Sequence, residues 1–341
     1  MTNFRRPSLK DIAQRLNVSI ATVSRALRGS PEIGPEMTSK VKALAEEMNY
    51  HPNPFARSLR ERASRVIGVV VPNIATHYYA TVLEGIEDAA TKAGYSVISA
   101  NSHENHELEK KVIDNFLTMH VEGIIACLAQ DSQDYTHFQK IHELGVPLVF
   151  FARTCLPELF SSVTADGDVA AQKATQHLID TGSRRIAFIG GPNHLDMVRR
   201  RKHGYLEALR ESHIPIDREL VACNKIDYDV AREKVVEMIR SDHRPDAVIA
   251  FNDIITYACF DAIKSEGLLI PDDVALIGFT DAEYSRFTTP RLSVIKDQAH
   301  KTGERACELL MGHLNGDTKL HHEVVPMILE IRESSSKHTG D

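Results

Sequence analysis

The chain of 341 residues lacks the features that would place it in a membrane, outside the cell or among zinc proteins. No apolar run approaches the roughly 20 residues that a membrane-spanning helix needs. The basic segment 1–7 is followed by no apolar stretch, so no secretory signal is expected and a reducing cytoplasm fits best. The five cysteines are scattered without a CxxC pair, which argues against a disulfide framework or a zinc site.

Motifs typical of enzymes are missing as well. Gly190-Gly191-Pro192 lacks the glycine spacing of a dinucleotide- or phosphate-binding loop. The segment 103–107 (His-Glu-Asn-His-Glu) carries its histidines at i and i+3, not at the i and i+4 of a zinc protease helix, and is typical of a charged helix start. No nucleophile and base can be paired by spacing. We therefore expect no enzyme, no cofactor and no metal.

The net charge of −7 by itself argues against a nucleic-acid partner, but it hides a division along the chain. Residues 1–65 hold 12 basic and 6 acidic residues, whereas the remainder holds 28 basic and 41 acidic residues. A basic N-terminal module on an acidic body indicates that the two parts have different partners. On charge alone, a solvated basic extension is an equal alternative.

The first fifty residues carry the apolar spacing of short helices. One helix is predicted over residues 8–16, with Ser8 as its N-cap and Asp11 as the capping-box partner. Asn17 then interrupts the pattern, because asparagine tolerates the left-handed conformation of a tight turn.

A second helix is predicted over residues 20–27, capped by Ser19, and a third from about Pro35 to Met48. Two short helices joined by a three-residue turn and followed by a third make a helix-turn-helix. The second helix of that unit enters the major groove of DNA. A three-helix bundle that binds protein is the less favoured alternative.

Residues on and around the second helix have the chemistry for DNA contacts. Arg25 can donate two hydrogen bonds to a guanine edge, and Ile20 and Ala21 can contact thymine methyl groups. Phosphate contacts position a protein without reading sequence. The side chains suited to them are Ser8, Ser19, Thr22, Ser24 and Tyr50.

A short helix is predicted after the bundle, because Pro54 suits the first position of a helix of about seven residues. Helices of that length are marginal in water, so we expect it to fold only when something packs against it. Leu59 has no core to enter there, and a leucine wedged between base pairs in the minor groove is one use for it. An exposed linker leucine is the alternative.

The segments that carry a family resemblance are 8–13 (SLKDIA), 17–19 (NVS), 21–27 (ATVSRAL), 49–50 (NY), 52–53 (PN) and 56–59 (ARSL). They resemble the headpiece and hinge of the lactose/galactose repressor (LacI/GalR) family, nearly unbroken through residues 8–60 and more thinly to about residue 332. The resemblance implies a transcriptional repressor, a homodimer that binds a pseudo-palindromic DNA operator. By resemblance, Ile20, Ala21 and Arg25 read bases, and Asn53, Ala56 and Leu59 are hinge contacts, Leu59 being the wedge.

Beyond the hinge, short apolar runs alternate with helical stretches, which predicts an α/β fold of parallel sheets covered by helices. The runs form two series that open alike, at 64–69 and 184–189. Two doubly wound lobes are therefore expected, with ligands beyond the carboxyl ends of the strands. This matches the periplasmic-binding-protein-like core that the resemblance implies. The runs are 66–71, 97–98, 123–127, 148–151, 186–189, 247–251 and 274–279.

The resemblance also implies three crossings between the lobes, which we place near Val163, Leu292 and His321. The tail has no leucine heptads, so a dimer is expected rather than a coiled-coil tetramer. The expected boundaries are headpiece 1–50, hinge 51–65, core 66–333 and polar tail 334–341, with lobe one at about 66–163 and 293–321 and lobe two at about 164–292 and 322–333.

Polar side chains near the predicted strand ends are candidates for binding a small effector. They match ligand-contacting or near-cleft positions of the family, and Arg201 matches an arginine that grips polar effector groups. For each candidate a helix cap or a contact between the lobes is the alternative, and for Asn252 and Asp253 that alternative is equal. The candidates are Tyr78, Tyr79, Cys127, Arg153, Arg201, Asn252, Asp253 and Asp281.

Departures from the family pattern bear on the effector's chemistry. Cys127, Ala152 and Thr280 stand where many sugar-responsive relatives carry Asn, Asp and Asp. Loss of two carboxylates beside the basic run 199–202 predicts a positive site, hence an anionic effector such as a sugar acid or sugar phosphate rather than a neutral sugar. A sugar-binding transport protein with the same core is the alternative function, and the missing signal and the attached headpiece argue against it.

Overall fold

The computed structural model describes residues 7–50, 64–280 and 282–336. The chain divides into two compact units, residues 1–64 and 65–341, and each is described by itself. None of the helices in the described ranges is long and apolar enough to cross a membrane.

Within residues 7–50, the headpiece forms the three helices that the sequence predicts: α1 (Leu9–Leu16), α2 (Ile20–Leu27) and α3 (Pro35–Glu47). The backbone N–H of Ser8 donates to the Asp11 carboxylate at 2.8 Å, as expected for a capping box. Asn17 ends α1 with φ of 53°, the left-handed turn that asparagine tolerates. The buried core of this unit is Ile12, Ala13, Val23, Ala26, Val41 and Ala45.

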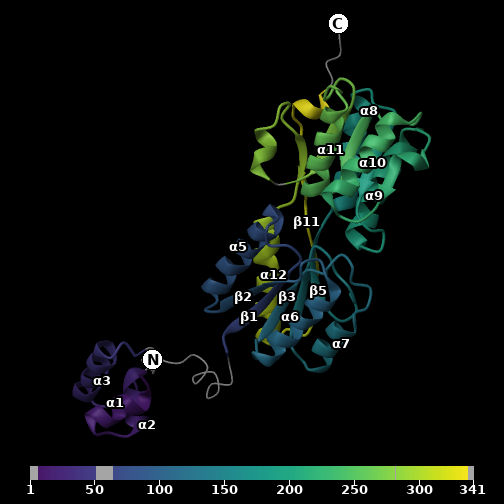
Figure 1. Ribbon diagram of the computed structural model, residues 1–341. Coiled ribbons are helices and arrows are strands. Elements are labelled where there is room, and N and C mark those ends of the chain that lie inside the picture. The colour runs from purple at the N-terminus through teal and green to yellow at the C-terminus, as the bar shows by residue number, and fades with distance from the viewer. Residues whose placement is uncertain (1–6, 51–63, 281, 337–341) are drawn as a thin grey trace. The chain divides into compact units, whose positions relative to one another are not determined.

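The second unit contains two lobes, each built on a sheet (Figure 1). In lobe one the strand order is β11-β5-β4-β3-β1-β2 and every pairing is parallel. Its strands are β1 (Val66–Val71), β2 (Ser96–Asn101), β3 (Gly123–Ala126), β4 (Leu148–Phe151), β5 (Ser161–Ala165) and β11 (His322–Val325). Its helices are α5 (His77–Lys92), α6 (His106–Thr118), α7 (Thr136–Glu143) and α12 (Ala299–Leu314).

Lobe two repeats this plan with the order β12-β10-β9-β8-β6-β7, and only its edge strand β12 pairs antiparallel among the described strands. Its strands are β6 (Ile186–Gly190), β7 (Val221–Cys223), β8 (Ala247–Ala250), β9 (Ala275–Phe279), β10 (Ser293–Lys296) and β12 (Ile328–Glu330). Its helices are α8 (Gly167–Asp180), α9 (Asp196–Glu211), α10 (Tyr228–Arg240) and α11 (Asp253–Ser265), with short 3-10 turns η1 (Arg218–Leu220), η2 (Glu283–Arg286) and η3 (Glu333–Ser335). The strands β1 to β5 of lobe one and β6 to β10 of lobe two follow the same order in their sheets, which confirms the prediction of two similar halves.

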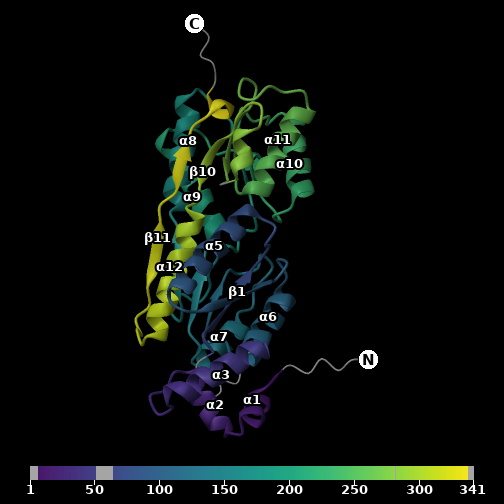
Figure 2. The same cartoon turned by 90° about the vertical axis from the view of Figure 1, so that its left-hand side faces the viewer.

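Helix pairs in both lobes approach closely through glycine. In lobe one α5 packs against α12 (Figure 2), and a Cβ at Gly85 would lie 2.1 Å from the carbonyl oxygen of His300. In lobe two α8 packs against α9, and a Cβ at Gly204 would lie 1.9 Å from the carbonyl oxygen of Asp168. Glycine at these positions lets two backbones touch, which fixes the crossing of each pair.

The chain crosses between the lobes after β5, after β10 and after β11. The sequence predicts these crossings near Val163, Leu292 and His321, which is a few residues too early at each. Ser293 pairs with Ile277 in the sheet of lobe two, whereas His322 pairs with Ser162 in the sheet of lobe one. The short strands around the crossings carry polar residues, which conceals where they end.

The C-terminal segment also differs from the prediction of a polar tail that begins at residue 334. Ser334 and Ser335 are fully buried. The Ser334 hydroxyl donates to the carbonyl oxygen of Leu276 at 2.6 Å and accepts from the backbone N–H of Ser293 at 2.8 Å. These serines are buried because the sheet of lobe two offers them hydrogen-bond partners.

Candidate functional site

The exposed face of α2 gathers most of the predicted base- and phosphate-contacting residues of the headpiece. Ser19, Ile20, Ala21 and Arg25 are exposed, and Ile20 keeps 48% of its surface accessible although it is apolar. The Ser19 hydroxyl accepts from the backbone N–H of Thr22 at 3.0 Å and so fixes the start of the helix.

Arg25 forms an ion pair with Glu32 at 3.2 Å, and both side chains are more than half exposed. Exposed ion pairs are worth little, so Arg25 can exchange this partner for another at small cost. Ser24 lies on the opposite, buried side of α2 and accepts hydrogen bonds from Arg28. It does not share the exposed face.

The remaining predicted DNA contacts lie elsewhere. Ser8 caps α1 through Asp11, and the half-buried Tyr50 packs against the headpiece core. Asn53, Ala56 and Leu59 of the predicted hinge lie outside the described residues, as does Asp281 of the predicted effector set.

A cavity of about 110 Å³ lies between the two lobes of the core unit. It is lined from the carboxyl ends of strands in both sheets, where two doubly wound lobes are expected to bind ligands. We call it the interlobe pocket. Its lining residues are Asn73, Thr76, Tyr78, Tyr79, Glu104, Ala152, Arg153, Met197, Arg201, Ile226, Phe251, Asn252, Asp253, Ile254, Phe279, Thr280 and Asp297.

Arg201 enters the pocket from α9 and is held on several sides. Its guanidinium donates to the carbonyl oxygen of Phe251 at 2.5 Å and to the Asp297 carboxylate at 3.4 Å. The guanidinium carbon lies 4.0 Å from the ring centroid of Phe279 and 4.9 Å from that of Phe251. Burial lowers the pKa of Arg201, and Asp297 opposes that shift. The arginine is therefore a fixed, desolvated donor.

Arg153 forms a second charged group at the pocket wall. It makes a two-pronged ion pair with Glu104, at 2.7 and 3.1 Å, and Arg153 is 5% exposed. Burial disfavours its charged form, but Tyr79 and Glu104 raise the pKa of Arg153 above its usual value. Cys127 does not line the pocket: its thiol lies 3.8 Å from the Tyr79 hydroxyl, and burial raises its pKa to about 11.

Asn252 and Asp253 come from the start of α11. The Asn252 side chain accepts from the backbone N–H of Ile255 at 3.0 Å, which is the helix cap that the sequence leaves open as an alternative. Both residues also line the interlobe pocket, and Asp253 is buried. The two readings are therefore compatible, because a capping residue at a strand end can also face a ligand.

The expectation of a positively charged pocket is wrong for the described residues. Three carboxylates, those of Glu104, Asp253 and Asp297, line the pocket beside its two arginines. Arg199 and Lys202 are absent from this lining; they bond Asp196 at 3.0 Å and Asn193 at 2.5 Å.

Sequence reasoning missed two of these carboxylates for different reasons. Glu104 follows β2, but it sits in a polar stretch that is typical of a helix start. Asp297 follows β10 directly, and recognition of that strand would have indicated it.

A helix-turn-helix unit joined to a two-lobed core with a polar pocket defines the class of ligand-responsive DNA-binding regulators. The family description "Bacterial regulatory proteins, lacI family" matches residues 8–53, and "Periplasmic binding protein-like domain" matches residues 175–335. The chain is 31% identical to catabolite control protein A of Priestia megaterium, over 96% of this chain and 99% of that protein. It is 33% identical to the ribose operon repressor of Bacillus subtilis, over 89% and 91% respectively.

Solved structures agree. A complex of the transcriptional regulator CelR with cellobiose is 28% identical, covers 96% of this chain and 100% of its own, and has a TM-score of 0.74. The lac repressor dimer bound to operator and the anti-inducer ONPF shares the fold at 23% identity, with 97% and 99% coverage and a TM-score of 0.85. The chain belongs to the LacI family of bacterial regulatory proteins. It is a transcriptional regulator and not an enzyme.

Proposed function

We propose that the protein is a cytoplasmic repressor of carbohydrate-metabolism genes whose affinity for a pseudo-palindromic operator is set by a small effector. The observation that carries this proposal is one chain that contains both the exposed α2 face and the polar interlobe pocket. Its relatives carry names such as ribose operon repressor, which supports a carbohydrate operon as the target.

The α2 face supports sequence-specific DNA binding. Arg25 is an exposed arginine, whose planar guanidinium can donate two hydrogen bonds, and it lies near the exposed apolar residues Ile20 and Ala21. An arginine that reads guanine and small apolar side chains that contact thymine are a standard combination in the major groove. Ser19 and Thr22, at the same helix start, suit the adjacent phosphates.

Selection of a random DNA library on the purified protein tests this role, with Arg25→Ala compared against Arg15→Ala. Each variant removes one exposed arginine that has a glutamate partner, so the loss of nonspecific charge attraction is matched. We expect wild type and Arg15→Ala to enrich the same pseudo-palindrome. Arg25→Ala should lose about 1–3 kcal/mol of DNA-binding free energy and should lose the preference at one base pair of each half-site. Equal preferences in the two variants would refute the base-reading role.

The effector that the pocket fits best is a neutral sugar. Arg201 and Arg153 each already face a carboxylate, so neither presents an unbalanced charge to an anion. Sugar hydroxyls need both donors and acceptors, and Arg201, Asn252, Asp253 and Asp297 supply them at the pocket wall. The half-buried side chains of Met197 and Ile254 offer apolar surface for a sugar ring.

Titration calorimetry with neutral pentoses, hexoses and disaccharides, set against the corresponding sugar acids and phosphates, tests the effector class. We expect binding among the neutral sugars. Tight binding confined to the acids or phosphates would contradict this class and restore the anionic effector that the basic run 199–202 suggests.

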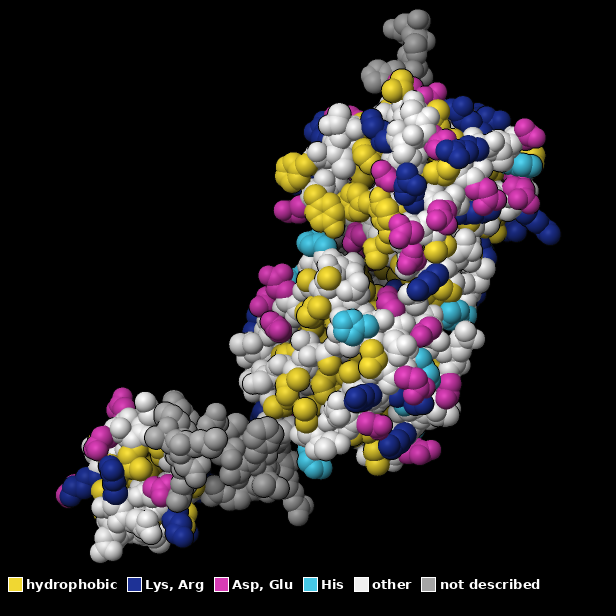
Figure 3. Space-filling model, in the orientation of Figure 1, with side chains coloured by type: hydrophobic (Ala, Val, Ile, Leu, Met, Phe, Trp, Pro, Cys, Tyr) yellow, Lys and Arg dark blue, Asp and Glu magenta, His cyan; other side chains and the backbone are white. Residues whose placement is uncertain are grey.

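The proposal includes a homodimer, for which lobe two offers an apolar surface. Phe287 is 81% exposed and Tyr284, on η2, is 52% exposed. Figure 3 shows hydrophobic side chains gathered on this side of lobe two. Exposed aromatic groups of this kind mark contact surfaces between proteins. Closure of the pocket in each subunit would then move lobe one, which follows the hinge in sequence, relative to the paired lobe two and change operator affinity.

A further inference from the structure

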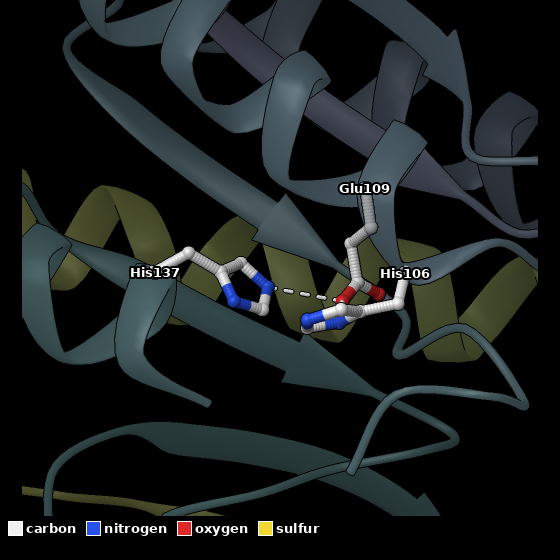
Figure 4. Close-up of side chains that lie close together, drawn as sticks. All are labelled: His106, Glu109 and His137. Carbon is white, nitrogen blue, oxygen red and sulfur yellow. Dashed lines mark hydrogen bonds and ion pairs between the residues drawn. The ribbon is translucent and has the colours of Figure 1, made fainter. Parts of the chain in front are cut away.

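Two histidines and a glutamate that do not themselves line the interlobe pocket converge in lobe one. His106 and Glu109 lie on α6 and His137 lies on α7 (Figure 4). The nitrogen Nε2 of His137 lies 3.0 Å from Glu109 Oε1, and Nδ1 of His106 lies 4.0 Å from the same oxygen. One candidate ligand atom from each residue falls within 4.8 Å of the other two.

The burial of this cluster is unusual for ionisable side chains. Glu109 is fully buried and His137 is 8% exposed. His137 bonds Glu109 through Nε2, whereas its Nδ1 is buried without a hydrogen-bond partner among the described residues. Hydrogen bonding therefore satisfies only the side of the ring that faces the cluster. The fully buried carboxylate of Glu109 thus faces two imidazole nitrogens, His137 Nε2 and His106 Nδ1, and the latter also lies 3.1 Å from the hydroxyl oxygen of Ser132.

The donor set is the one that zinc prefers. Two imidazole nitrogens and one carboxylate oxygen occur together in His-His-Glu zinc sites, with bonds of about 2.0–2.2 Å. Tetrahedral ligands at that radius lie about 3.3 Å apart, and the measured 3.0 and 4.0 Å separations bracket this value. We propose that His106, Glu109 and His137 bind one divalent transition-metal ion of the zinc class.

The cluster is accessible to solvent on one side, and hydrogen bonds orient its carboxylate. The His106 side chain keeps 19% of its surface exposed, so an ion can reach the cluster from solvent. The Glu109 carboxylate is oriented by the backbone N–H of Ala129 and the hydroxyl of Ser132, each at 2.7 Å. Ligating carboxylates are commonly held by such outer hydrogen bonds.

The segment that holds Glu109 also connects the two lobes. Gln130, between Ala129 and Ser132, donates its backbone N–H to Glu104 at the pocket wall at 2.8 Å. The Gln130 carbonyl oxygen accepts from His194 at 2.6 Å, and its side-chain oxygen accepts from the backbone N–H of Ile226 at 3.1 Å. The last two partners belong to lobe two. An ion bound by Glu109 therefore restrains the segment on which the lobes meet.

Calorimetric titration of metal-free, full-length protein with zinc chloride tests the site, with His106→Asn as the variant and His103→Asn as its matched control. His103 is exposed three residues earlier and has a positive φ of 52°, which asparagine adopts readily. We expect one zinc ion per chain in wild type and in His103→Asn. His106→Asn should bind at least about tenfold more weakly, and so should His137→Gln.

Thermal unfolding with and without zinc gives a second readout that also reports whether the variants fold. At the same zinc concentration, zinc should raise the melting temperature of wild type and His103→Asn by more than that of folded His106→Asn. Wild-type protein that binds no stoichiometric zinc would overturn the proposal. Zinc affinity in His106→Asn equal to that of wild type would also overturn it, because binding would then belong to other histidines among the 17 of the chain.

Discussion

Replacement of Glu104 by glutamine should destabilise the core unit, because it leaves the buried positive charge of Arg153 without its carboxylate partner. Glutamine keeps the size of the side chain and still offers an oxygen to the backbone N–H of Gln130. Arg153, however, loses its ionised partner and keeps the carbonyl oxygen of Leu128, at 3.3 Å, as an acceptor. An arginine that is 5% exposed cannot replace the lost carboxylate with bulk water.

Breaking a buried ion pair from one side costs roughly 3–5 kcal/mol. Glu104 retains 19% exposure, so we expect a loss near the lower end, about 3 kcal/mol of the free energy of unfolding. The double variant Glu104→Gln/Arg153→Met removes both charges and should recover much of that loss. Urea unfolding of the full-length chain, followed by circular dichroism, measures each value.

Asp196→Asn is the matched control, since it neutralises one partner of the exposed ion pair with Arg199, in which both side chains are about half accessible. Its effect should stay below about 0.5 kcal/mol. If Glu104→Gln cost no more than Asp196→Asn, or if the double variant were no more stable than the single one, the reasoning from buried charge would be refuted.

Three further predictions follow from other contacts. Gly204→Ala should destabilise lobe two by about 1–3 kcal/mol, because the added Cβ meets the backbone of Asp168. Gly312→Ala should be neutral or stabilising, because an added Cβ at this helical position has no neighbour nearer than 4.0 Å. Equal urea midpoints for the two variants would contradict this expectation. Hydrogen bonding to Lys296, together with Arg332, lowers the pKa of Glu330 to about 2. The stability that this carboxylate contributes is therefore complete above pH 4.5 and is lost as the pH falls toward 2. Glu330→Gln should flatten that part of the plot of urea midpoint against pH. Arg201→Lys should weaken sugar binding at least about tenfold in calorimetry, because lysine lacks the planar fork, and Arg199→Lys on the same helix should bind like wild type.

The parts of the fold that follow from sequence are those governed by strong local periodicity. Residues 8–16 and 20–27 carry caps and apolar spacing that specify α1 and α2 within a residue, and Asn17 marks the turn between them. The buried central strands, such as β1 and β8, are continuous apolar runs. Continuous apolar runs are typical of the central strands of a parallel sheet that helices cover on both faces.

The parts that escape prediction depend on partners distant in sequence. β5, β10 and β11 are short and contain serine, lysine or histidine, so the predicted crossings between the lobes fall a few residues too early. Asp297 enters the pocket only because β10 ends beside it. The histidine-rich segment 103–107 shows no zinc spacing, yet His106 meets Glu109 and, from another helix, His137. A local sequence pattern on one helix cannot indicate that His137, from a second helix, joins the cluster.

Operator affinity measured with and without the effector tests whether the interlobe pocket controls DNA binding. Fluorescence anisotropy with the selected operator should give a dissociation constant that changes about 5- to 150-fold when the pocket is saturated with the sugar found by calorimetry. The change should disappear in Arg201→Lys at the same sugar concentration and persist in Arg199→Lys. A wild-type protein that binds the sugar yet holds its operator with unchanged affinity would show that the pocket does not control DNA binding.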